Sequence, residues 1–126
     1  MLATTPVLLV EDNDDLRAAL ARLLRFRGYR VVETRDGQEA WDYLKSGGRP
    51  CLIVLDLLLP RMDGRRLRAK LLEDDAYACI PVIIFTAADG QEELTDVAGY
   101  IRKTEPFDLL DMIEQTALPA LGEDDL

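Results

Sequence analysis

The chain alternates between short apolar runs and longer segments of mixed polarity. Four runs are nearly continuous in Val, Ile and Leu, as parallel strands buried on both faces must be. They cover residues 7–10, 51–55, 81–85 and, more briefly, 99–101. A fifth run, residues 29–33, is less apolar. The pattern predicts five strands, with the fifth run at an edge of the sheet.

The segments between the runs show helical spacing. Leu16, Leu20, Leu23 and Leu24 recur at i, i+4, i+7 and i+8, and Gly28 then supplies a stop. The apolar positions of three further helices are Ala40, Tyr43 and Leu44, then Leu67, Leu71 and Leu72, and finally Phe107, Leu110, Ile113 and Leu118. Strand and helix alternate throughout, which predicts an α/β doubly wound parallel sheet.

Glycine, proline and aspartate mark the ends of these helices. Gly47 and Gly48 close the second helix, and Pro106 opens the last one. Asp63 and Gly64 are typical of a turn that leads into the third helix.

Polar residues stand where the apolar runs end. Glu11 and Asp12 follow the first run, Asp56 follows the second, Thr86 ends the third, and Lys103 lies just past the fourth. In a doubly wound sheet the binding crevice lies beyond the carboxyl ends of the strands. We therefore expect three acids, one hydroxyl and one ammonium group at a single edge.

Three carboxylates in a partly desolvated crevice repel one another, so they must bind protons or a cation. Oxygen ligands of this number, with room for water, suit Mg²⁺. The metal and Lys103 together would neutralise the three acids, which leaves the site able to accept a further anion. This chemistry permits a carboxylate to attack phosphorus and form an aspartyl phosphate.

The motifs "VLLVEDN", "LIVLDLLLPRMDG", "VIIFTA" and "YIRK" occur in order along the chain. Together they resemble the receiver domain of two-component response regulators, and the resemblance covers almost the whole chain. It implies a flavodoxin-like fold with strand order 2-1-3-4-5 and five helices. We expect residues 1–126 to be a single receiver domain, with a core over about 6–118 and an acidic tail at 122–126.

The resemblance also implies how the chemistry is divided. Asp56 would be the phosphoacceptor, with Glu11 and Asp12 as the acidic pair at a Mg²⁺ site. The backbone carbonyl of Leu58 would be a further metal ligand.

Three residues of the later strands complete the implied site. Thr86 would carry the switch hydroxyl, Lys103 would contact the phosphoryl group, and Tyr100 would be the aromatic switch residue. A histidine kinase or phosphotransfer protein would supply the phosphoryl group, and the domain would signal by protein contact. Such a domain is not an enzyme beyond its own phosphorylation and dephosphorylation.

Other interpretations of the same residues remain. Asp12, Asn13 or Asp14 can each cap the helix that follows. Asp12 and Asp14 are also spaced as in haloacid-dehalogenase-like phosphatases, but Leu16 stands where that family has Thr or Val. Leu16 likewise excludes a calcium loop. Glu11 and Asp12 would repel a flavin phosphate. The main rival is a receiver-shaped module that binds partners without being phosphorylated.

The stretch before the last strand departs from the family pattern. Only residues 87–99 separate Thr86 from Tyr100, close to the minimum of about a dozen for a crossover. We expect the fourth helix to be truncated to about 91–97, or replaced by a loop. Because partners of this family usually contact the fourth helix, fifth strand and fifth helix, we also expect an altered output face.

The second departure follows Lys103. Receivers usually have proline directly after this lysine, whereas here Thr104 and Glu105 precede Pro106. A cis bond to Thr104 would cost about 2.5–4 kcal/mol, so we expect Lys103–Thr104 to be trans. The longer loop can restore the position of the lysine, or Glu105 can pair with Lys103 when phosphate is absent.

Composition narrows the class further. The formal charge is −9, with a pI near 4.4, so nucleic acid would be repelled. No apolar run approaches the about 20 residues of a membrane span. Cys51 and Cys79 lie beside apolar runs, which favours reduced, half-buried thiols. We expect a cytoplasmic monomer that does not bind membranes.

Overall fold

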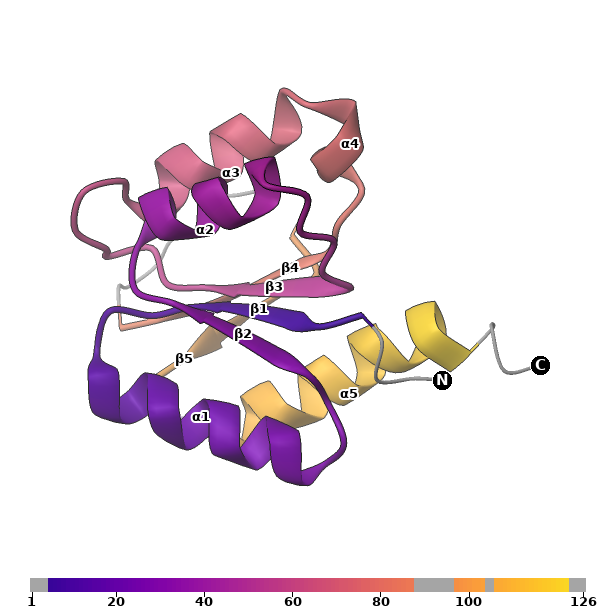
Figure 1. The fold of residues 1–126 in the computed structure, drawn as a ribbon. Coiled ribbons are helices and arrows are strands. Elements are labelled where there is room, and N and C mark those ends of the chain that lie inside the picture. The colour runs from indigo at the N-terminus through magenta and orange to yellow at the C-terminus, as the bar shows by residue number, and fades with distance from the viewer. Residues whose placement is uncertain (1–4, 88–96, 104–105, 123–126) are drawn as a thin grey trace.

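A five-stranded parallel sheet forms the centre of the molecule in the computed structural model, which describes residues 5–87, 97–103 and 106–122 (Figure 1). The strands are β1 (Val7–Val10), β2 (Val31–Thr34), β3 (Leu52–Leu55), β4 (Val82–Thr86) and β5 (Gly99–Arg102). Their order is β2-β1-β3-β4-β5 and every pair is parallel. The doubly wound, flavodoxin-like fold is therefore confirmed, with β2 at an edge as predicted.

Helices cover both faces of the sheet. The described residues form five of them: α1 (Asp14–Phe26), α2 (Gly37–Lys45), α3 (Gly64–Leu72), α4 (Asp75–Ala78) and α5 (Pro106–Gly122). α1 and α5 lie on one face, and α2, α3 and the short α4 lie on the other (Figure 1). Within the described ranges, no helix combines the length and apolar character that a membrane span requires.

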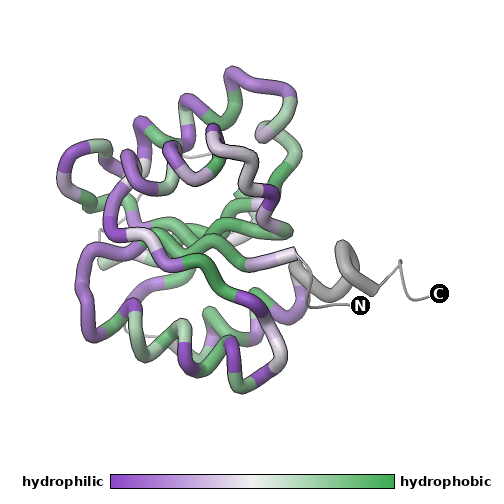
Figure 2. Tube along the Cα trace, in the orientation of Figure 1, coloured by the Kyte–Doolittle hydropathy of each residue, from purple (hydrophilic) through white to green (hydrophobic). Residues whose placement is uncertain are grey.

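The apolar runs fill a core on each side of the sheet. Alternate residues of a strand point to opposite faces. In β1, Val7 and Leu9 accordingly pack with α1 and α5, while Leu8 and Val10 pack with α2 and α3. All four are at most 1% exposed. Figure 2 shows the strands as a hydrophobic layer between helices of mixed polarity. Because both faces are covered, the sequence shows a continuous apolar run instead of alternation.

Side-chain caps start the helices at the carboxyl edge of the sheet. Asn13 caps α1, since its Oδ1 accepts the N–H of Leu16 at 2.9 Å. Asp63 caps α3 by accepting the N–H of Arg66 at 2.9 Å, which confirms the predicted turn. Because Asn13 is the cap of α1, the exposed Asp12 is not needed for that purpose.

One short helix was not predicted. α4 has four residues between α3 and β4, is capped by Asp74, and is tied to α2 by a 3.1 Å hydrogen bond from the Tyr77 hydroxyl to the carbonyl of Leu44. One turn of helix is too short to produce a hydrophobic period. This α4 is distinct from the truncated helix predicted near 91–97, which, apart from its last residue, lies outside the described residues.

The cysteines confirm one expectation and correct another. Both thiols are free, and Cys51 is half-buried, as predicted. Burial raises the pKa of the Cys51 thiol, which keeps it protonated. Cys79 is exposed, so its predicted burial is wrong. The reason is its place at the C-terminal cap of α4, where the chain is still on the surface.

We predict that Gly64→Ala lowers the free energy of unfolding by about 1–3 kcal/mol, as overpacking usually does. A Cβ at Gly64 would lie 2.3 Å from the carbonyl oxygen of Asp56 and 2.7 Å from the Cα of Leu57, both backbone atoms. Urea unfolding measures the loss. Gly48→Ala is the control, because its Cβ would meet only the ring of Tyr43, at 2.4 Å, and that side chain can rotate. Equal losses in both variants would contradict the prediction.

Candidate functional site

The carboxyl ends of the strands bring the predicted acids together. Glu11 and Asp12 follow β1, and Asp56 follows β3. One carboxylate oxygen from each lies within 4.8 Å of the others. Glu11 and Asp56 are 1% and 3% exposed, whereas Asp12 is exposed to solvent. Two buried acids and one open acid therefore form a cluster that is accessible from one side.

Lys103 lies inside this cluster. Its Nζ is 2.7 Å from Oδ2 of Asp56 and 2.9 Å from each carboxylate oxygen of Glu11. The lysine side chain is 21% exposed. The structure thus brings Lys103 to the acids, as its position just past the last apolar run predicted.

The backbone of Lys103 explains how it reaches the acids. Thr86 and Arg102 are the last paired residues of β4 and β5. The N–H of Lys103 donates to the carbonyl of Thr86 at 3.1 Å, which extends the strand pairing by one residue. The side chain is therefore placed by the sheet itself. The Lys103–Thr104 bond and Glu105, on which the sequence predictions also bear, lie outside the described residues.

Burial and charge oppose each other in this cluster. Burial raises the pKa of Glu11, an effect that the hydrogen bonds from Lys103 and from the N–H of Asn13 reduce without cancelling. Burial lowers the pKa of Lys103, but its hydrogen bonds to Asp56 and Glu11 outweigh this and leave the pKa raised. Lys103 is therefore charged at neutral pH, and Glu11 would be stabilised in its ionised form by a further cation.

Asp56 is held at both carboxylate oxygens. Its backbone N–H donates to the carbonyl of Val10 at 3.2 Å, which keeps the residue in register with β1. Oδ1 accepts the N–H of Leu58 at 3.1 Å, and Oδ2 accepts from Lys103. The side chain of Leu58 points outward and is 55% exposed. Its carbonyl as a metal ligand stays a prediction.

The two predicted switch residues come from neighbouring strands. Thr86 ends β4 and is fully buried. Tyr100 pairs with Ile84 in the sheet and is half-buried, on the face that α2 and α3 cover. Their switch roles stay predictions.

An ion pair that the sequence did not predict forms a clamp on the loop between β3 and α3. Arg61 donates from Nε and Nη2 to the two carboxylate oxygens of Asp36, at 2.8 and 3.0 Å. Asp36 also caps α2 by accepting the N–H of Glu39 at 2.9 Å. The N–H of Gly37 donates to the backbone carbonyl of Met62 at 3.0 Å. Asp36 followed three residues later by Glu39 is a helix-start signal that could have shown the cap. Nothing in the sequence pairs Arg61 with Asp36.

The backbone at Arg61 supports the importance of this clamp. Its φ is 61°, a left-handed backbone conformation that residues other than glycine seldom adopt. A bidentate ion pair to a buried carboxylate offsets the backbone strain. The loop that carries Asp56 and Leu58 is thus held at its far end by α2.

Comparison with known proteins agrees with the fold. Residues 7–114 match the model of the response regulator receiver domain. The chain therefore belongs to the response regulator receiver domain family. It is 40% identical over 91 residues to the response regulator MprA of Mycolicibacterium vanbaalenii, an alignment that covers 69% of this chain. The same alignment covers 36% of MprA, so the chain spans about a third of the length of that relative.

Solved structures of this family superpose closely. The phosphorylated cyanobacterial phytochrome response regulator RcpA is 31% identical, with a TM-score of 0.80 and coverage of 92% of this chain and 95% of that chain. The Mn²⁺-bound form of response regulator Rcp1 is 28% identical, with a TM-score of 0.76 and coverage of 87% and 91%.

We predict that Arg61→Gln raises the pKa of the Asp36 carboxyl group. Burial raises this pKa, but the hydrogen bonds from Arg61 and from the N–H of Glu39 outweigh it and leave the pKa below its usual value. The pair therefore stabilises the fold at pH values above about 3.9, the unfolded value, and this contribution is lost as the pH falls through the lower folded pKa. A carbon-13 NMR titration of the carboxyl group measures the shift.

Arg35→Gln is the matched control for that titration. Arg35 carries the same charge one residue before Asp36, but its hydrogen bonds go to Glu39. The Asp36 pKa should stay low in this variant. If both variants shifted it equally, net charge and not the bidentate contact would be the cause.

Proposed function

We propose that this receiver domain accepts a phosphoryl group on Asp56 from a histidine kinase or phosphotransfer protein, with Mg²⁺ bound beside it. One observation carries the proposal: the Nζ of Lys103 lies 2.7 Å from the Asp56 carboxylate within a cluster that also holds Glu11 and Asp12. A nucleophilic carboxylate, a charge-neutralising lysine and further acids for a metal are the parts that phosphoryl transfer to an acid requires.

The acids fit a divalent metal. Oxygen ligands from Glu11, Asp12 and Asp56, with the carbonyl of Leu58 and water, match the preference of Mg²⁺. When bound, the metal would neutralise charge on the phosphoryl oxygens. The solved structures of Mn²⁺-bound Rcp1 and phosphorylated RcpA support both parts of the proposal for this family.

The residues of the chain then have defined tasks. A carboxylate oxygen of Asp56 forms a bond to phosphorus while the bond from phosphorus to the imidazole nitrogen of the donor breaks, and the electron pair leaves with that nitrogen. The N–H of Leu58 orients the carboxylate. Lys103 moves its ammonium group from the carboxylate to a phosphoryl oxygen, and the Thr86 hydroxyl donates to another.

Signalling would follow from the two switch residues. Thr86 and Tyr100 lie on the neighbouring strands β4 and β5. If the Thr86 hydroxyl turned toward the phosphoryl group, the space available to the Tyr100 ring would change. The output would be contact with another protein, since a net charge of −9 disfavours nucleic acid. The only reactions promoted would be phosphorylation and dephosphorylation of the domain itself.

Phosphorylation can be tested directly by intact mass. The full chain incubated with a small-molecule phosphodonor and Mg²⁺ should gain the mass of one phosphoryl group, which mild base removes. Asp56→Asn should gain nothing, because an amide is not a nucleophile at phosphorus. Omission of Mg²⁺ should reduce the modification at least about tenfold.

Asp63→Asn is the matched control for this experiment. It makes the same chemical change in the same loop, and asparagine caps a helix as well as aspartate does. This variant should be modified like the wild type. An unmodified wild type, with no magnesium-dependent binding of beryllofluoride, would instead favour a module that acts without phosphorylation.

We also predict a long-lived phosphoryl group, with a half-life of minutes or more. The exposed side chain of Leu58, two residues after Asp56, offers no polar atom to orient an attacking water. Leu58→Gln should shorten the half-life by roughly tenfold, a modest effect for a positioned polar group. Leu72→Gln, at a similarly exposed leucine on α3, should leave it unchanged. A wild-type half-life of seconds would refute the prediction.

A further inference from the structure

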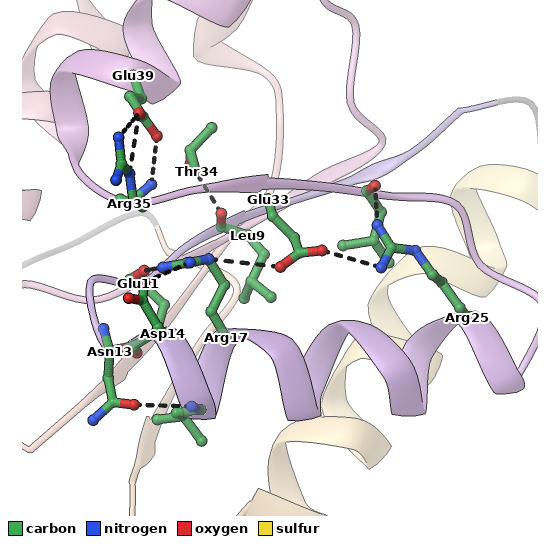
Figure 3. A network of polar contacts seen from close by, with 12 residues as sticks. Leu9, Glu11, Asn13, Asp14, Arg17, Arg25, Glu33, Thr34, Arg35 and Glu39 are labelled. Atoms are coloured by element: carbon green, nitrogen blue, oxygen red, sulfur yellow. Dashed lines mark hydrogen bonds and ion pairs between the residues drawn. The ribbon is translucent and has the colours of Figure 1, made fainter.

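Arg17 on α1 is mostly buried beside the acidic cluster, with a side chain that is 13% exposed. Its Nη1 donates to the backbone carbonyl of Glu11 at 2.9 Å, and its Nη2 donates to Oδ1 of Asp14 at 2.6 Å (Figure 3). Its Nε lies 3.6 Å from Oε1 of Glu33. One guanidinium group therefore joins the turn after β1, the first turn of α1, and β2.

The contact with Glu11 occurs where β1 stops pairing with β2. The N–H of Glu11 donates to the backbone carbonyl of Thr34 at 3.0 Å, which extends the strand pairing by one residue. The chain then turns away into α1, so the carbonyl of Glu11 needs another donor, and Arg17 supplies it. Because Glu11 is 1% exposed, leaving this carbonyl without a partner would be costly. Arg17 thereby fixes the peptide plane between Glu11 and Asp12.

That peptide plane sets the direction of two acids. The carboxylate of Glu11 is also held at its far end, by Lys103 and by the N–H of Asn13 at 3.1 Å. Asp12 is exposed to solvent, and the direction of its side chain depends on the backbone that precedes it. Arg17 is thus the side chain that turns this backbone toward the cluster.

We propose that Arg17 is a positioning residue for the metal site, acting through the Glu11 carbonyl to aim the carboxylates of Glu11 and Asp12. This inference rests on the proposed function, because it assumes that these acids bind a divalent cation. Groups that orient metal-ligating side chains typically change metal affinity by about 10–100-fold when removed.

Charge alone predicts the opposite effect. Arg17 is a cation next to an acidic segment, so its removal increases the negative potential at the cluster and would strengthen the binding of a divalent cation. Loss of positioning would weaken binding. The sign of the change therefore separates the two roles.

Arg25 provides a matched control on the same helix. Its Nη2 donates to the carbonyl of Val31 at 3.1 Å, and its Nη1 contacts Oε2 of Glu33 at 3.1 Å (Figure 3). Arg25→Gln thus removes one charge, one bond to a backbone carbonyl, and an ion pair with the same Glu33. Both contacts are with β2, and neither involves Glu11.

Binding of Mn²⁺ to the full chain tests the proposal, with free Mn²⁺ measured by electron paramagnetic resonance. Mn²⁺ accepts the same oxygen ligands as Mg²⁺. Arg17→Gln should weaken binding about tenfold or more, and Arg17→Lys should weaken it as well, because a single ammonium group cannot reproduce the guanidinium fork. Arg25→Gln should stay within about twofold of the wild type.

Melting temperatures of the metal-free variants show whether each is folded. If Arg17→Gln is not folded, the Mn²⁺ affinity of Arg17→Lys decides whether Arg17 is a positioning residue. Binding by the Arg17 variants that equals or exceeds that of Arg25→Gln would overturn the positioning role while leaving the metal site intact. A wild type that fails to bind Mn²⁺, or binds it equally well after Glu11→Gln, would overturn the metal site itself and with it the inference.

Discussion

The arrangement of this domain depends on the repulsion between carboxylates that the sheet forces together. Parallel strands bring their carboxyl ends to one edge, so Glu11 and Asp56, which directly follow the neighbouring strands β1 and β3, cannot move apart without loss of strand pairing. The ammonium group of Lys103, delivered by β5, relieves this repulsion from the other side of β4. Among the described residues, the core therefore holds together three acids and one lysine, and this excess of carboxylates is the physical basis of the proposed divalent-cation site.

Much of this was predictable from the chain. Continuous apolar runs such as residues 7–10 identify strands covered on both faces, and the polar residue after each run identifies the shared edge. The convergence of Glu11, Asp12, Asp56 and Lys103 was expected because parallel strands bring their carboxyl ends to one edge. A helix start could be predicted where one capping residue stands alone, as Asp63 does before α3. Asn13 could not be chosen as the cap of α1 over Asp12 and Asp14, because all three residue types can cap a helix.

What the sequence could not provide is the partner of each long side chain. Arg61 and Asp36 are 25 residues apart in the chain, and nothing in their local sequences relates them. The bond from Arg17 goes to a backbone carbonyl, an acceptor that every residue carries and that therefore leaves no compositional signal. The single turn of α4 is shorter than the period by which helices are recognised. The unpredicted features are thus the ones that orient the loops around the site.

The hydrogen bond between Lys103 and Thr86 has a consequence for how the lysine is held in this chain. The lysine is held by its own backbone N–H, which donates to the carbonyl of Thr86 and precedes the side chain along the backbone. The hydrogen bond to Thr86 therefore fixes the backbone of the lysine before the chain reaches residue 104. The ammonium group reaches the acids from a backbone position that the sheet sets, with no proline directly after the lysine.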